Sequence, residues 1–253
     1  SGAPTATINA LASDGTRVFI AYASSGVYVS ISSGVTIAAW ITGTDDYTML
    51  DYVNGRLIGG NAHKVDSLDL YPTAVNIHTN RDIATRFVGG AAGSGFIYAA
   101  GFSGDRSIIL KTTLTADATA LAAMSVAAQL PTGEVVSSLF GYLGFILVGS
   151  NKGVRFCAAD TAGNLTVGPV IPTSGAVKDF TADGRFVWYT YTNYDGTSGG
   201  LGRLDLSTFT AATTPAYATD LMYASTAAIL SCATFNGYRM FTVSGIGVVY
   251  EDT

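Results

Sequence analysis

The sequence has few charged residues. Asp, Glu, Lys and Arg make up 12% of its 253 residues, against about 25% in an average soluble domain. The 13 basic and 18 acidic residues give a formal net charge of −5, and the basic residues are scattered singly along the chain. A nucleic-acid-binding protein needs a basic patch to neutralise phosphates, so this scarcity argues against nucleic acid as a partner.

Cysteine and histidine are equally scarce. Cys157 and Cys232 form no Cys-x-x-Cys motif, so we expect two small buried thiols, with a disulfide between them as the alternative. The only imidazoles belong to His63 and His78. His78, within "VNIHTN", fits a strand residue with a structural role, whereas His63 fits a loop. The chain therefore has little material for imidazole catalysis.

Long uninterrupted hydrophobic runs are also missing. Segments 18–44 and 135–151 carry no charge, but Ser and Gly interrupt both. We therefore expect buried strands and no membrane insertion. The opening "SGAPTAT" is not a basic segment followed by an apolar one, so no signal peptide is expected.

What the sequence does contain is a repeat of about forty residues. Six segments share an apolar run, a glycine and a second apolar run, as in "DYVNGRLIGGN" and "TADGRFVWYTY". Their glycines are Gly15, Gly55, Gly95, Gly144, Gly184 and Gly237, at spacings of 40, 40, 49, 40 and 53. Asp14, Asn54, Asp183 and Asn236 precede four of them, and an Asx-Gly pair is typical of type I′ turns. Each glycine therefore predicts a two-stranded hairpin.

Further apolar segments follow each hairpin. A third, such as "GVYVSI", comes next, and a fourth, such as "GVTIAAWITG", usually follows. Four strands in about forty residues are the pattern of a propeller blade. We predict an all-β fold, a six-bladed β-propeller of four-stranded antiparallel blades, with three strands visible in the last. A β-sandwich pair and a solenoid are the alternatives.

The predicted propeller is a single domain over residues 1–253. Its blades are expected near residues 5–43, 46–80, 83–131, 134–172, 176–222 and 227–253. The insertion 115–123 is expected to form a helical turn, and "TYTNYDGTSGG" a longer loop between strands two and three of blade five. Trp40 and Trp188 lie in apolar strand patterns, so we expect both to pack between blades.

The loop connections of a propeller predict where binding occurs. Loops from strand two to three, and from strand four to the next blade, share one face, and loops on a rigid scaffold often carry binding residues. This face is expected to collect many charged and aromatic side chains: Asp45, Asp46, Tyr47, His63, Lys64, Arg81, Asp82, Asp105, Arg106, Glu134, Lys152, Tyr191, Tyr194, Asp195, Asp220 and Tyr223. Few long side chains are expected on the opposite, tight-turn face.

The loop from Tyr191 to Gly200 is the strongest candidate for ligand binding. Its aromatic rings and Asp195 lie among Gly, Ser and Thr, a composition suited to an adaptable contact surface and to a sugar ring. The predicted ligand-binding residues are Tyr191, Tyr194, Asp195, Asp45, Asp46, Tyr47 and His63. "GTSGG" matches G-x-S-x-G but lies in a loop and not in a strand–turn–helix. We expect no catalytic residue, no metal ligand and no cofactor.

The blades, above all "DYVNGRLIGGNAHKVDSLDL" and "ASDGTRVFIAYASSGVYVSI", resemble those of irregular propeller domains in bacteriophage tail and virion proteins. The resemblance covers the whole chain and rests on architecture and composition, without a diagnostic motif. It implies a non-enzymatic structural or host-recognition module on a virion, extracellular, which contacts other virion subunits or a host-surface glycan and can form oligomers. The alternatives are a propeller hydrolase or lactonase with an acidic metal site, and a secreted bacterial propeller that binds other proteins.

Overall fold

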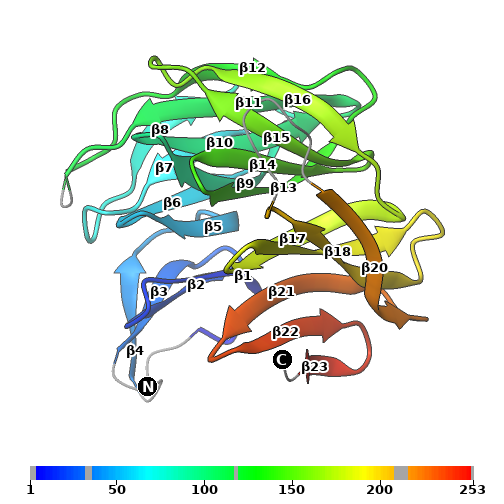
Figure 1. Ribbon diagram of the computed structural model, residues 1–253. Coiled ribbons are helices and arrows are strands. Elements are labelled where there is room, and N and C mark those ends of the chain that lie inside the picture. The colour runs from blue at the N-terminus through cyan, green and yellow to red at the C-terminus, as the bar shows by residue number, and fades with distance from the viewer. Residues whose placement is uncertain (1–3, 32–35, 117–118, 208–215, 252–253) are drawn as a thin grey trace. The chain divides into compact units, whose positions relative to one another are not determined.

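Six small antiparallel sheets make up the fold (Figure 1). The computed structural model describes residues 4–31, 36–116, 119–207 and 216–251. In these ranges five sheets have four strands, the sixth has three, and the strands of every sheet pair in chain order. The prediction of a six-bladed β-propeller with a three-stranded last blade is confirmed.

Each blade occupies one continuous stretch of the chain. Blade one contains β1 (Ile8–Ser13), β2 (Val18–Tyr22), β3 (Gly26–Ile31) and β4 (Thr36–Ile41), and blade two contains β5 (Tyr47–Val53), β6 (Arg56–Asn61), β7 (Lys64–Ser67) and β8 (Val75–Thr79). Blade three contains β9 (Arg86–Gly93), β10 (Phe96–Ser103), β11 (Arg106–Thr113) and β12 (Ser125–Gln129), and blade four contains β13 (Val136–Tyr142), β14 (Phe145–Ser150), β15 (Gly153–Ala159) and β16 (Leu165–Ile171). Blade five contains β17 (Gly175–Asp183), β18 (Phe186–Asn193), β19 (Gly199–Asp205) and β20 (Ala216–Ser225), and blade six contains β21 (Ile229–Phe235), β22 (Tyr238–Val243) and β23 (Gly247–Glu251).

The first two strands of each blade form the predicted hairpins, but the turns differ. Positive φ at both central residues defines a type I′ turn, and Asn54–Gly55 has φ of 48° and 87°. The turns at Gly95, Gly144 and Gly237 follow the same rule, with Ser, Leu and Asn before the glycine. Asp14 and Asp183 do not take positive φ. An Asx before glycine therefore did not by itself identify the turn type.

Contacts divide the chain into two compact units. Unit 1 comprises Ser1–Gly133 and Asp160–Asn164, and unit 2 comprises Glu134–Ala159 and Leu165–Thr253. Unit 1 therefore holds blades one to three, and unit 2 holds blades four to six apart from the 160–164 turn. The single domain over residues 1–253 stays a prediction.

The hydrophobic cores lie between neighbouring blades of the same unit. In unit 1 one cluster joins Phe19 of blade one to Tyr47 and Leu57 of blade two, and another joins blades two and three. In unit 2 Trp188 of blade five packs with Phe241 of blade six. A blade is too thin to bury both of its faces alone, so packing against a neighbour supplies the missing cover.

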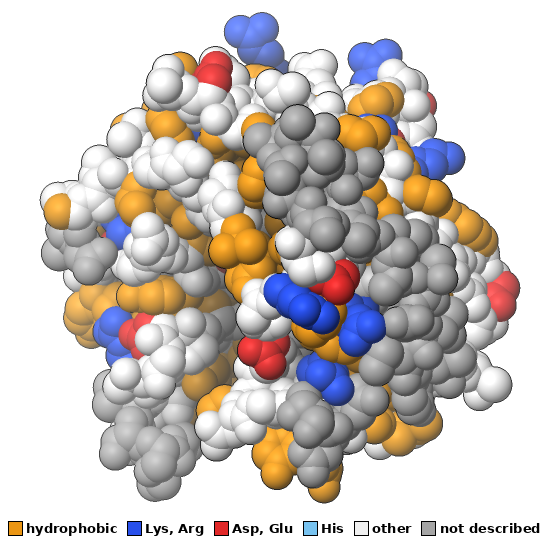
Figure 2. Space-filling model, viewed as in Figure 1, with side chains coloured by type: hydrophobic (Ala, Val, Ile, Leu, Met, Phe, Trp, Pro, Cys, Tyr) orange, Lys and Arg blue, Asp and Glu red, His pale blue; other side chains and the backbone are white. Residues whose placement is uncertain are grey.

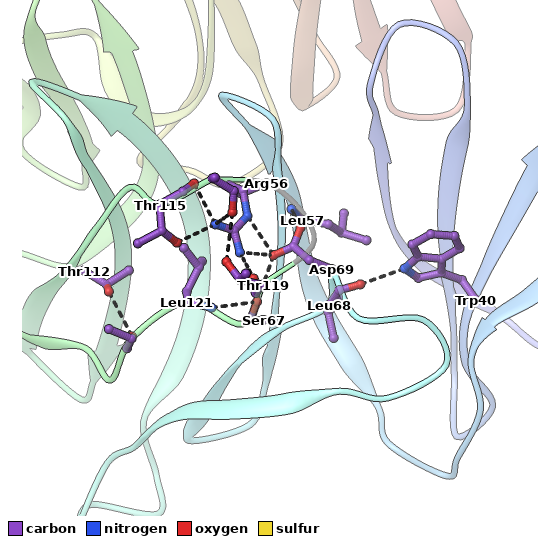
Figure 3. A network of polar contacts seen from close by, with 12 residues as sticks. Trp40, Arg56, Leu57, Ser67, Leu68, Asp69, Thr112, Thr115, Thr119 and Leu121 are labelled. Atoms are coloured by element: carbon purple, nitrogen blue, oxygen red, sulfur yellow. Dashed lines mark hydrogen bonds and ion pairs between the residues drawn. The ribbon is translucent and has the colours of Figure 1, made fainter.

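Both tryptophans pack between blades, as predicted. The Trp40 indole Nε1 donates to the Leu68 carbonyl at 2.7 Å, which joins blade one to blade two (Figure 3). Trp188 is 1% exposed and lies in the core of blades five and six. Cys157 and Cys232 are free thiols, and burial raises the pKa of Cys157 to about 11. The prediction of separate thiols is confirmed.

Arg56, fully buried at the start of β6, fixes the insertion in blade three (Figure 3). Its Nη2 lies 2.9 Å from Oδ2 of Asp69. Its Nη1 donates to the carbonyls of Thr115 at 2.9 Å and Ala116 at 3.2 Å, and Nη2 donates to the carbonyl of Thr119. The described residues of the insertion, 115–116 and 119–123, form no helix. The predicted helical turn is therefore wrong: Arg56 takes carbonyls that a helix would use internally.

None of the described residues belongs to a helix long and apolar enough to cross a membrane.

Candidate functional site

The two kinds of loop assigned to one face do lie together in unit 1. The turn between β6 and β7 bonds to the connection that leaves β8, because the Asn80 N–H donates to the His63 carbonyl at 2.8 Å. In blade three the Gly133 N–H donates to the Asp105 carbonyl at 2.9 Å in the same way. The topology prediction is confirmed for these loops.

Asp45 and Asp46 lie in this face but are occupied by the protein's own amides. Asp45 Oδ1 accepts from Asn61 Nδ2 at 2.8 Å. Asp46 Oδ1 accepts from Asn9 Nδ2 at 2.6 Å and more weakly from the Ser24 N–H at 3.4 Å. These bonds tie the connection between blades one and two to β1, to the β2–β3 turn and to the end of β6. Ligand binding by the two carboxylates stays a prediction.

Tyr47 and His63 differ from their predicted exposure. Tyr47 begins β5, is fully buried, and donates its hydroxyl to Asp66 Oδ2 at 2.8 Å. Burial, and then the Asp66 charge, raises the Tyr47 pKa well above its ordinary value. The position of Tyr47 in a surface loop is therefore corrected: it is a core residue whose hydroxyl has a partner. His63 is half-buried in the β6–β7 turn.

In unit 2 the predicted loop offers one exposed ring. Tyr191 lies within β18, is 3% exposed and packs in the core of blades four and five, so its assignment to the loop is corrected. Tyr194 is 70% exposed, and its hydroxyl donates to the Asn151 carbonyl at 3.1 Å. Asp195 accepts from the N–H groups of Thr197 and Ser198, which lower its pKa.

Glu134, Asp220 and Tyr223 also belong to the predicted loop face. Glu134 is 2% exposed and binds Arg155 through both carboxylate oxygens, at 2.7 to 3.0 Å, so it is an internal ion pair and not a loop-surface charge. The side chains of Asp220 and Tyr223 lie outside the described residues.

A polar depression of about 410 Å³ lies in unit 1 on the predicted loop face. Three segments form it: the connection from β8 to β9, the turn from β10 to β11, and the end of β12 with the residues after it. Its lining residues are Asn80, Asp82, Thr85, Ser103, Arg106, Ser107, Ile108, Gln129, Leu130 and Thr132. We call it the polar depression below. None of the seven predicted ligand-binding residues lines it, whereas Asp82 and Arg106 belong to the predicted set of loop charges.

Backbone bonds hold the three segments in place. The Leu130 N–H donates to the Ser107 carbonyl at 3.1 Å, which joins the end of β12 to the start of β11. Thr85 and Ser107 are 2% and 4% exposed. The Thr85 N–H donates to the Asp82 carbonyl at 3.1 Å and closes the β8–β9 connection into a turn. The depression thus has a fixed, mainly backbone-determined base.

The two charged lining residues have different surroundings. Asp82 Oδ1 accepts from the Ala84 N–H at 2.9 Å. The Ser103 hydroxyl, followed by that N–H, lowers the Asp82 pKa, so the carboxylate stays ionised. Arg106 is exposed, and no acidic side chain among the described residues forms an ion pair with it. Its guanidinium therefore keeps its hydrogen-bond donors for solvent or a ligand.

The lining suits a polar ligand with many hydroxyls. Asn80 and Gln129 line it with amides and the exposed Thr132 with a hydroxyl, whereas Thr85 and Ser107 are buried and the Ser103 hydroxyl bonds to Asp82. Each of these groups both donates and accepts hydrogen bonds. A volume of about 410 Å³ lies in the range of small-ligand sites. Sequence reasoning missed the grouping because its three segments, 80–85, 103–108 and 129–132, lie far apart in the sequence, although the loop charges Asp82 and Arg106 marked two of them.

Basic residues that are separate in the sequence also gather in unit 2. The guanidinium carbons of Arg185 and Arg203 lie 4.7 and 4.5 Å from the Phe186 ring centroid, and that of Arg239 lies 4.3 Å from the Trp188 ring. Figure 2 shows such a gathering of basic side chains around hydrophobic ones. These arginines are therefore far apart in the sequence but close together in space. Arginine soon after the turn glycine, as at Gly184 and Gly237, is the signal that marks two of the three.

No group of three or more His, Cys, Asp and Glu side chains that could hold a metal ion occurs among the described residues.

Comparison with known proteins identifies the fold alone. No family model matches the chain, and no curated protein matches it. The WD40 domain of Pan2 from Neurospora crassa matches with a TM-score of 0.61 and 15% identity, over 98% of this chain and 76% of that one. A putative 6-phosphogluconolactonase from Bacteroides uniformis matches with 0.62 and 14%, over 95% and 81%. The PQQ-bound aldose sugar dehydrogenase of Streptomyces coelicolor matches with 0.55 and 11%, over 81% and 76%. These structures are a WD40 domain, a putative lactonase and a dehydrogenase, all at most 15% identical to this chain, so they support the architecture and no particular activity.

Proposed function

We propose that this chain is a non-enzymatic propeller that binds a saccharide through the polar depression. The observation that supports the proposal is the lining: the amides of Asn80 and Gln129, the exposed hydroxyl of Thr132 and two charged groups line one depression of about 410 Å³. A sugar presents hydroxyls that donate and accept hydrogen bonds, and such a lining can satisfy them from several sides.

The setting that we propose is the surface of a phage tail or virion, with a host-surface glycan or a neighbouring virion subunit as the partner. The charge-poor, Gly-, Ser-, Thr- and Ala-rich composition supports this setting. Many copies on one particle would raise a weak single-site affinity through avidity. This makes recognition possible without a deep pocket.

A glycan array and a whole-cell binding assay on the purified chain test the proposal. Gln129 and Thr132 are exposed and line the depression, so the double variant Gln129→Ala, Thr132→Ala should fold normally. We expect it to lose at least about tenfold in glycan affinity, since two hydrogen-bonding groups at about 1 kcal/mol each are removed.

The matched control lies in the other predicted loop. The double variant Tyr194→Ala, Asp195→Ala should keep the affinity of the parent chain. Loss of binding in this control alone would move the site to the loop of unit 2. Turnover of a lactone or ester by the parent chain would contradict the non-enzymatic assignment.

A further inference from the structure

Arg106 is the one cationic group that lines the polar depression. It begins β11, directly after the β10–β11 turn, and its side chain is exposed. The nearby Arg86 differs, because its Nη1 already donates to the carbonyls of Ile83 at 3.1 Å and Thr85 at 2.8 Å. Arg106 forms no such bond among the described residues. Its donors are therefore available at the lining of the depression.

The acidic group of the depression does not neutralise this guanidinium. Asp82 accepts from the Ala84 N–H at 2.9 Å, and it forms no ion pair with Arg106 in the described part of the chain. A carboxylate with its acceptors bonded locally, and with a lowered pKa, stays where it is and stays charged. A ligand that enters the depression thus meets an available cation and a fixed anion.

We infer that the ligand of the depression is an acidic saccharide whose carboxylate binds Arg106. This inference rests on the proposed saccharide-binding function and names the substrate class for it. A planar guanidinium matches a carboxylate through two parallel N–H···O bonds, which gives orientation as well as affinity.

The charge count favours a carboxylate over a phosphate ester. One guanidinium matches one negative charge, whereas a phosphate monoester carries close to two near neutral pH. The ionised Asp82 in the same lining repels any anion, and it repels a dianion about twice as strongly as a monoanion, so a single carboxylate meets the smaller penalty. The remaining lining groups, Asn80, Gln129 and the hydroxyls, would take the ring hydroxyls of the sugar.

The experiment compares two sugars that differ at one carbon. Calorimetric titration of the full chain with methyl glucuronide and with methyl glucoside measures the contribution of the carboxylate. We expect the uronide to bind at least about tenfold more tightly in low salt, with a preference that shrinks as salt rises. Arg106→Gln should abolish the preference, so that the variant binds uronide and glucoside with affinities equal within about twofold. Arg106→Lys, which keeps the charge but loses the planar fork, should retain only part of it.

Lys152→Gln is the matched control. Lys152 is an exposed cation of the same class of loop in unit 2, and its removal changes the net charge by the same amount. We expect the preference to survive in this variant. Equal loss in both variants would assign the preference to overall charge and overturn the role of Arg106.

The remaining outcomes separate the inference from the proposed function. Equal affinity for uronide and glucoside in the parent chain would overturn the inference and leave saccharide binding intact. No affinity for any sugar in the titrations or on the array would overturn the proposed function itself. Tighter binding of glucose 6-phosphate than of the uronide would replace the carboxylate by a phosphoryl group.

Discussion

Arg56 and Arg106 begin strands in the same unit, yet the chain uses them in opposite ways. Each is the first residue of its strand after a tight turn, β6 and β11 respectively. Arg56 is fully buried and bonded to Asp69 and to the carbonyls of the 115–123 insertion, whereas Arg106 is exposed and forms no ion pair among the described residues. An arginine whose N–H groups donate to backbone carbonyls stabilises a loop. An arginine whose N–H groups have no such bond is available to bind a ligand.

The same contrast separates the two ends of unit 1. At the tight-turn end, Arg56 donates to carbonyls that lie 59 to 63 positions later in the chain, and its side chain is fully buried. At the loop end, backbone bonds and the side chains of Asn80 and Asp82 fix the base of the polar depression, and Arg106 forms no ion pair there among the described residues. This division predicts which substitutions change stability and which change binding.

Arg56→Met should give the largest loss of stability. It leaves Asp69 as a buried carboxylate without its cation and removes the donor to three carbonyls, and breaking a buried pair from one side costs about 3–5 kcal/mol. Urea unfolding, with hydrogen exchange at residues 119–123, measures the loss. The double variant Arg56→Met, Asp69→Asn should recover part of it. A loss below about 1 kcal/mol in the single variant would contradict the contrast.

Asp179 offers the complementary case to Arg56, because it is a buried acidic group that has no arginine as an ion-pair partner among the described residues. It accepts from the N–H groups of Cys232 at 3.0 Å and Phe180 at 2.8 Å. Burial nevertheless raises its pKa to about 6, against about 3.9 in an unfolded chain. Between about pH 4 and 6 the Asp179 carboxyl is protonated in the folded chain and ionised in the unfolded chain. The protonated carboxyl therefore stabilises the fold fully below about pH 4, and this contribution is lost as pH rises through about 6.

Unfolding free energies at pH 4 and pH 8 for the parent chain and Asp179→Asn measure this effect. Asparagine has one acceptor oxygen fewer than the carboxylate at both pH values and does not titrate. The difference between the two pH profiles therefore measures the contribution of Asp179 protonation to stability. Relative to the variant, the parent chain should lose up to about 3 kcal/mol between the two pH values, because a pKa shift of one unit corresponds to about 1.4 kcal/mol. Parallel pH profiles would show that the carboxyl is not perturbed.

The sequence predicts the blades well because their signals are local. Turn residues and the period of apolar runs lie within ten residues of one another, so the hairpins at Gly55 and Gly144 follow directly. Burial within a strand is different: Tyr47 and Tyr191 stand next to loops in the sequence but belong to cores built between blades. Whether an aromatic side chain at the end of a strand is buried depends on the neighbouring blade, and the residues of that blade lie far away in the sequence.

The polar depression shows the same limit for function. The charges at Asp82 and Arg106 are visible in the sequence as loop residues. We prefer them to Asp45 and Asp46 as ligand-binding residues because the Asn61 and Asn9 side chains already donate hydrogen bonds to the Asp45 and Asp46 carboxylates. Free donors are a property of three-dimensional contacts. The composition of a loop cannot reveal them.

Trp40→Phe should have a smaller effect than either buried charge. The change keeps an aromatic ring between blades one and two but removes the Nε1 donor to the Leu68 carbonyl at 2.7 Å. A neutral hydrogen bond contributes about 1 kcal/mol, and the carbonyl left behind is partly buried. We expect a loss of about 1–2 kcal/mol in urea unfolding. An unchanged midpoint would mean that water replaces the indole.

Arg106→Gln should leave stability almost unchanged and thereby complete the comparison. Surface substitutions away from caps, cores and buried pairs usually stay within about 0.5 kcal/mol, and Arg106 forms no ion pair with a described residue. Urea unfolding beside Arg56→Met provides the measurement. A loss above about 1 kcal/mol would show that Arg106 also supports the fold, and a fall in uronide affinity could then no longer be read as a lost contact with the ligand. A normal midpoint with a lost preference for the carboxylate separates recognition from stability at this position.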